Sequence, residues 1–98
     1  MKIVIIDDSP DALALAKARL TKECDDIFCA NCGKDGLKMV REEIPDLILL
    51  DVDMPDISGF DICRTLKNDE DLHTIPIIFL SGTCGQQDKV KGLDIGAV

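Results

Sequence analysis

Three short apolar runs constrain the fold of this chain more than any other feature. They lie at residues 3–6 (IVII), 47–50 (LILL) and 77–80 (IIFL). None of them alternates polar with apolar residues, which indicates strands buried on both faces, as in a parallel sheet covered by helices. A weaker run at residues 27–30 (IFCA) fits a strand at the edge of the same sheet.

The segments between these runs have the residue spacing of amphipathic helices. Ser9 and Pro10 are typical of a helix start, as N-cap and first helical residue, and Leu13, Ala16 and Leu20 then predict a buried stripe. Further helices are predicted over residues 34–43, 60–67 and 86–95. Strands that alternate with helices in this order predict an α/β fold with a doubly wound parallel sheet and helices on both faces.

Length and composition set the class of the protein. The 98 residues form one predicted domain, residues 1–98. Eleven Lys and Arg against nineteen Asp and Glu give a net charge of −8, which argues against binding to nucleic acid or to an anionic membrane surface. The apolar runs are far too short to span a bilayer, and no signal peptide is recognisable, so a cytoplasmic location is expected. The odd number of five cysteines favours reduced thiols over a disulfide framework.

Acidic and hydroxyl side chains follow the predicted strands. Asp7 and Asp8 follow the run at residues 3–6, Asp51 follows the run at 47–50, and Ser81 follows the run at 77–80. Ligands of open α/β sheets bind beyond the carboxyl ends of the strands, so three carboxylates and a hydroxyl are expected to meet there. Carboxylates this close repel one another unless a cation lies between them, and Mg²⁺ takes such oxygen ligands. The cluster therefore indicates phosphoryl chemistry with one aspartate as nucleophile.

Other polar residues have plainer interpretations. Cys29 and Cys32 have the spacing of half a zinc site, but no second pair or histidine follows at a useful distance, so both are expected to be buried small residues. His73 is expected in an exposed loop. Three further aspartates are expected to act as helix caps or solvated loop residues: Asp11, Asp56 and Asp61.

The chain also carries three motifs in a fixed order. They are Asp7-Asp8 after an apolar run, LLDVDMPDISG at residues 49–59, and IPIIFLSG at residues 75–82. Together they resemble a response-regulator receiver domain of the CheY-like kind, over essentially the whole chain. The resemblance implies a flavodoxin-like fold with strand order 2-1-3-4-5, the order known for this family.

The resemblance also implies a role for each site residue. Asp51 matches the phosphoacceptor, and Asp7 and Asp8 match the acidic pair that holds Mg²⁺. The main-chain carbonyl of Asp53 matches a further ligand of the ion, so that the implied metal site consists of these residues and Asp51. Ser81 matches the hydroxyl that binds the phosphoryl group and shifts on activation. Pro55 and Gly59 match the turn that shapes the loop after the acceptor strand.

The function that the resemblance implies is two-component signal transduction. A sensor histidine kinase or a phosphotransfer protein would supply the phosphoryl group, and an output domain or a downstream protein would receive the signal. The protein would assist its own phosphorylation and dephosphorylation without turning over a substrate, and so would not be an enzyme in the usual sense. No direct binding to nucleic acid or to a membrane is expected of this domain.

The chain departs from the family pattern near its end. The family's lysine lies at the end of a fifth strand, and this sequence stops at Val98, before that strand; Lys89 and Lys91 fall on the predicted fourth helix. The chain is therefore expected to be an incomplete receiver domain with strand order 2-1-3-4 and without the fifth βα unit. A polypeptide that ended there would expose the fourth strand as an open edge, and instability, aggregation or dimerisation would be expected.

Two alternatives stay open at this point. A haloacid-dehalogenase-like phosphohydrolase has a two-aspartate motif similar to Asp51-Val52-Asp53, but its metal-binding acids usually follow its nucleophile, whereas Asp7 and Asp8 precede it here. A non-phosphorylated, receiver-like interaction module is the second alternative. The retained acids argue against it, and the missing lysine argues for it.

Overall fold

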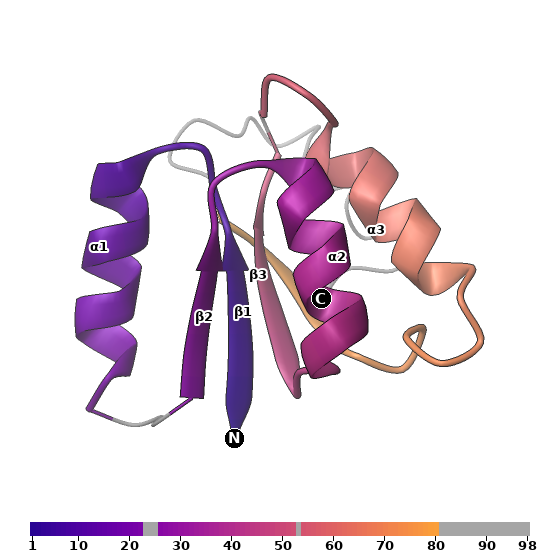
Figure 1. Ribbon diagram of the computed structural model, residues 1–98, viewed down its shortest axis with the longest axis horizontal. Coiled ribbons are helices and arrows are strands. Elements are labelled where there is room, and N and C mark those ends of the chain that lie inside the picture. The colour runs from indigo at the N-terminus through magenta and orange to yellow at the C-terminus, as the bar shows by residue number, and fades with distance from the viewer. Residues whose placement is uncertain (23–25, 53, 81–98) are drawn as a thin grey trace.

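The computed structural model describes residues 1–22, 26–52 and 54–80. The elements within these ranges are β1 (Lys2–Ile6), α1 (Pro10–Leu20), β2 (Asp26–Ala30), α2 (Gly33–Glu43), β3 (Leu47–Asp51), α3 (Gly59–Lys67) and β4 (Ile77–Leu80) (Figure 1). Each lies where the sequence predicted it, with ends that shift by a residue at most. The helix predicted over residues 86–95 lies outside the described residues.

All the described strands pair in parallel, in the order β2-β1-β3-β4. The register places Ile5 of β1 between Cys29 of β2 and Leu49 of β3. At the far end of β3, Asp51 pairs with Leu80 of β4. This topology confirms the predicted doubly wound, flavodoxin-like sheet, with β2 at an edge.

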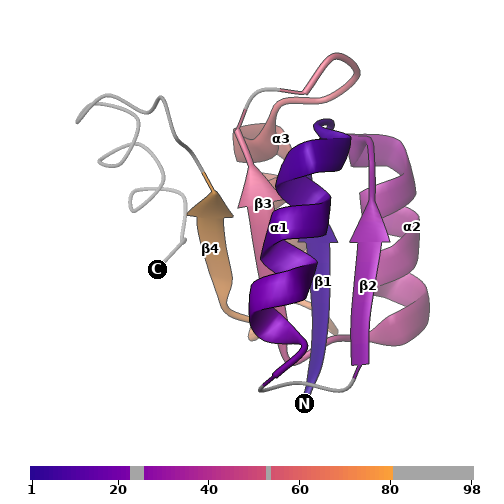
Figure 2. The same ribbon diagram turned by 90° about the vertical axis from the view of Figure 1, so that its left-hand side faces the viewer.

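Helices cover both faces of the sheet (Figures 1 and 2). In Figure 2, α1 lies in front of the strands, whereas α2 lies behind them. The larger apolar cluster fills the space between the sheet and the pair α2 and α3, and includes Val4, Ile6, Val40, Ile48, Leu50, Ile62 and Leu66. A smaller cluster on the α1 side is built on Ile3, Ile5 and Leu49. No helix in the described ranges is long and apolar enough to cross a bilayer.

Burial on both faces holds for β1 and for the centre of β3, as predicted, but not for every element. In β4, Ile77 is buried whereas Ile78 is 39% exposed. The stripe predicted on α1 packs against the smaller cluster but is only half-buried: Leu13, Ala16 and Leu20. Among the described elements, α1 lies alone on its face of the sheet, and its flanks therefore stay open. The helices α2 and α3 instead cover each other's flanks.

Candidate functional site

Three carboxylates meet at the edge of the sheet where the adjacent strands β1 and β3 end. Asp7 and Asp8 follow β1, and Asp51 is the last residue of β3. One carboxylate oxygen from each residue lies within 4.8 Å of the other two. The structure thus brings together the three acids that the sequence placed at this edge.

The three aspartates differ in burial and in how firmly they are held. Asp7 is only 6% exposed, and its main-chain N–H donates to the carbonyl of Ala30 at 3.0 Å. Its Oδ1 accepts the N–H of Ser9 at 2.9 Å. Asp8 is exposed, and Asp51 is half-buried. Asp7 is therefore the buried and firmly held member of the cluster, whereas Asp51 is partly accessible to solvent.

The chemistry of this donor set suits a hard divalent cation. Carboxylates within 4.8 Å of one another repel strongly when ionised, and Mg²⁺ typically takes one or two carboxylates together with water and phosphate oxygens. Among the described residues, no other group of three or more His, Cys, Asp or Glu side chains could hold a metal ion. Cys29, Cys32 and His73 therefore stay outside any such group in that part of the chain.

The loop after β3 is closed by a glycine. The N–H of Gly59 donates to the carbonyl of Val52 at 2.8 Å. A Cβ atom on Gly59 would clash with the carbonyl of Asp51 and lie 2.8 Å from the Cα of Val52. Only glycine allows the start of α3 to lie against the end of β3, which gives a physical reason for the turn that the sequence motif implied.

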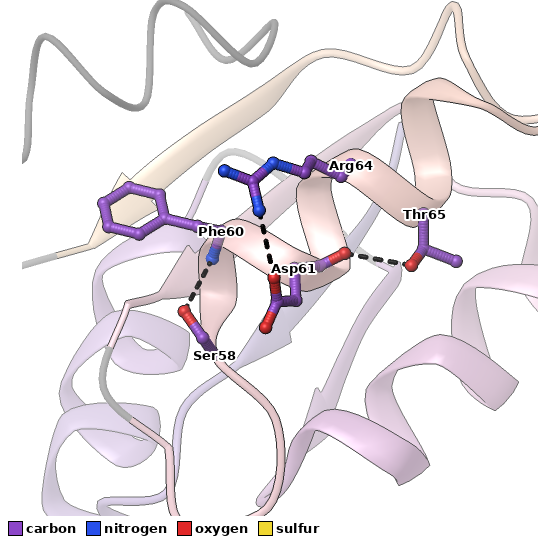
Figure 3. A network of polar contacts seen from close by, with 5 residues as sticks. All are labelled: Ser58, Phe60, Asp61, Arg64 and Thr65. Carbon is purple, nitrogen blue, oxygen red and sulfur yellow. Dashed lines mark hydrogen bonds and ion pairs between the residues drawn. The ribbon is translucent and has the colours of Figure 1, made fainter.

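The start of α3 anchors the other end of this loop (Figure 3). The Oγ of Ser58 accepts the N–H of Phe60 at 3.2 Å, and Asp61 pairs with Arg64 at 3.2 Å. Thr65 donates its hydroxyl to the carbonyl of Asp61 at 2.9 Å. The ring of Phe60 packs edge-on against Phe79 of β4, with centroids 5.1 Å apart. The helix is thereby fixed both at its cap and against the sheet.

Asp56 has a partner that the sequence did not indicate. It was expected to act as a helix cap or a solvated loop residue, and it does cap a helix, α2: Oδ1 accepts the N–H of Gly33 at 3.0 Å, and Oδ2 accepts the N–H of Lys34 at 2.9 Å. These two hydrogen bonds hold the pKa of Asp56 below its usual value of 3.8, and the bond from Lys34 has the larger effect. A sequence signal for this contact is that Cys32, which precedes α2, is a poor N-cap residue. In the structure it makes no side-chain cap bond, so the helix start is open to a cap from elsewhere.

The remaining predicted residues fall into three groups. Asp53 and Ser81 lie outside the described residues, so their roles stay predictions. Three residues are exposed as expected: Asp11, Asp61 and His73. Cys29 and Cys32 keep free thiols, as predicted, but they are only half-buried and not buried as expected. Cys29 lies on the edge strand and Cys32 precedes α2, and neither position is fully covered.

Comparison with known proteins gives one consistent picture. The family model described as "Response regulator receiver domain" matches residues 3–98. The response regulator PleD of Caulobacter vibrioides is 38% identical over 96 residues, which cover 98% of this chain and 21% of PleD. The chain thus spans about a fifth of the length of the curated relatives it matches.

Solved structures agree with this match. The signal receiver domain of a signal transduction histidine kinase from Syntrophus aciditrophicus is 34% identical, with a TM-score of 0.86 over 98% of this chain and 73% of that chain. The BeF₃-activated N-terminal receiver domain of RstA from Klebsiella pneumoniae is 31% identical, with a TM-score of 0.89 over 99% of this chain and 80% of that chain.

Proposed function

The chain belongs to the family of response regulator receiver domains, and from this premise we propose that Asp51 is its phosphoacceptor. The observation that supports the proposal most strongly is the convergence of the three carboxylates at the end of β3. Residues 1–98 would act within one receiver domain of a two-component pathway. A histidine kinase or a phosphotransfer protein would supply the phosphoryl group, and an output domain or a downstream protein would respond to it.

In the proposed reaction, a carboxylate oxygen of Asp51 attacks the phosphorus atom of a phosphohistidine. The new O–P bond forms as the N–P bond breaks, and the bonding electrons go to the ring nitrogen; the histidine, protonated on its other ring nitrogen, leaves as a neutral imidazole. Asp51 suits this role because its main chain is paired in the sheet while the residue is only half-buried, so it is positioned by β3 and stays partly accessible.

Asp7 and Asp8, with the main-chain carbonyl of residue 53, would hold Mg²⁺ next to Asp51. The bound ion would neutralise charge on the phosphoryl oxygens. The hydrogen bond from Ser9 fixes one oxygen of Asp7, which keeps that carboxylate oriented towards the site. Ser81 would bind the transferred group through its hydroxyl. A receiver working in this way acts in the cytoplasm, where the kinase domain and its phosphodonor are found.

One experiment separates this function from its two alternatives. The full-length protein that contains residues 1–98 is incubated with acetyl phosphate, with Mg²⁺ or with a chelator, and its intact mass is followed. A receiver gains one phosphate per chain, only when Mg²⁺ is present. A phosphohydrolase would instead release product continuously from a phosphomonoester such as p-nitrophenyl phosphate. A protein that shows neither behaviour would be a non-phosphorylated interaction module, and the proposal would be wrong.

A further inference from the structure

The first turn of α2 depends on a side chain from a distant loop. The N–H groups at the start of a helix have no partner within it, and the N-cap residue Cys32 makes no side-chain cap bond. The carboxylate of Asp56 fills this place, because it accepts the N–H groups of both Gly33 and Lys34. A loop 23 residues further along the chain therefore caps α2.

The same loop directly follows Asp51. Its base is closed by the bond from the N–H of Gly59 to the carbonyl of Val52, and its far side is held on α2 by Asp56. The missing side chain of Gly33 makes this close approach possible, since a Cβ there would lie 3.0 Å from the Cβ of Ile57. The described residues of this loop, 52 and 54–58, are thus held by Gly59 within their own βα unit and by Asp56 on α2.

We propose that Asp56 is a positioning residue for the phosphoacceptor site. By holding the loop that follows β3 on α2, it restrains the end of that strand, where Asp51 lies. Asp56 does not belong to the carboxylate cluster itself, so it acts through the loop and not as a ligand. This inference rests on the proposed function, because it concerns the affinity of that site for Mg²⁺.

The test is a calorimetric titration with Mg²⁺ alone, since the chain has neither Trp nor Tyr to report binding by fluorescence. Asp56→Ala should weaken Mg²⁺ binding about tenfold, the lower end of the range for groups that orient metal ligands. Asp61→Ala is the matched control. It removes the same charge from an exposed residue on the neighbouring helix, where the carboxylate contacts Arg64, and it should change the affinity by less than about twofold, as expected for a screened surface charge.

A second variant separates positioning from general stability. Cys32→Ser gives α2 its own cap side chain, so the double variant Cys32→Ser/Asp56→Ala should regain thermal stability that Asp56→Ala alone loses. Its Mg²⁺ affinity should nevertheless stay low, because the loop is still released from the helix. If the affinity recovers together with the stability, Asp56 acts only by stabilising the fold, and the inference is wrong.

The outcomes also distinguish the inference from the proposed function. If the unmutated protein binds Mg²⁺ and Asp8→Ala abolishes that binding, the metal site stands. An unchanged affinity in Asp56→Ala would then overturn the positioning role alone. If the unmutated protein does not bind Mg²⁺ at all, the metal site and the positioning role are both wrong.

Discussion

At the scale of single residues, Gly59 occupies a position where the main chain leaves no room for a side chain. An added methyl group would meet main-chain atoms of Asp51 and Val52, which cannot rotate away. We expect Gly59→Ala to lower the free energy of unfolding by about 3 kcal/mol, the upper part of the range for overpacking. Gly36→Ala is the comparison, because its Cβ would meet only side-chain atoms of Ile6. Urea denaturation of both variants should show the larger loss for Gly59→Ala, and an equal or smaller loss would contradict this reading of the turn.

The charge of Asp56 gives stability a defined dependence on pH. Its pKa is lowered in the folded protein because the N–H groups of Lys34 and Gly33 stabilise the carboxylate. A lowered folded pKa means that the stabilisation is fully present above the usual pKa of 3.8 that applies to the unfolded chain, and is lost as the pH falls through the folded value. The stability difference between the unmutated protein and Asp56→Ala should therefore be constant near pH 7 and shrink below about pH 4. Thermal melts between pH 7 and pH 3 measure it, and a constant difference throughout would rule out the charged cap.

At the scale of elements, the end of α2 holds a strained residue. Ile44 has a φ of 45°, a left-handed conformation that costs a residue with a Cβ about 1–2 kcal/mol, and β-branched side chains are especially unsuited to it. The position is the C-cap of the helix, where glycine is favoured. The side chain is 59% exposed, so little packing is lost when it is removed.

We therefore expect Ile44→Gly to raise the free energy of unfolding by about 1 kcal/mol, through relief of this strain. Ile44→Val is the control, because valine keeps the branched Cβ and should give no gain. Denaturant midpoints of the two variants decide the question. A destabilised Ile44→Gly would show that the exposed isoleucine contributes more packing than its surroundings indicate.

The elements also show what could be predicted from the sequence. Strand positions and the convergence of Asp7 and Asp51 follow from unbroken apolar runs, since parallel strands end at a common edge. The capping of α2 by Asp56 could not be predicted, because it joins residues 23 apart and depends on how two loops pack. The apolar stripe of α1 was predicted correctly, but its partial exposure was not, because periodicity gives the apolar face of a helix and not how much of it neighbours cover.

At the scale of the whole molecule, the strand order creates the site. From β1 the chain passes to β2 on one side of it, and then to β3 on the other. The two connections therefore diverge at the carboxyl ends of β1 and β3, which is where open sheets of this kind bind ligands. Asp7, Asp8 and Asp51 lie at this divergence point because of the topology, and any protein wound in this way offers a site there.

Binding of Mg²⁺ at that point should stabilise the entire fold. At a hundredfold excess over its dissociation constant, an ion that binds only the folded state adds about 2.7 kcal/mol. Asp8→Ala should abolish the Mg²⁺-dependent rise in melting temperature, and it should melt no lower than the unmutated protein without the ion, because it also relieves repulsion among the carboxylates. Superimposable melts of the unmutated protein with and without Mg²⁺ would show that the acidic cluster does not bind the ion.

The most direct measurement of the central claim is the location of the phosphoryl group. After reaction with acetyl phosphate and Mg²⁺, peptide mass spectrometry should place the group on Asp51, one of nineteen acidic residues in the chain. The bond should resist acid and break in base, as expected for an acyl phosphate, and Asp51→Asn should take up no label. A phosphate on any other residue, or equal labelling of Asp51→Asn, would contradict the assignment of Asp51 as the phosphoacceptor.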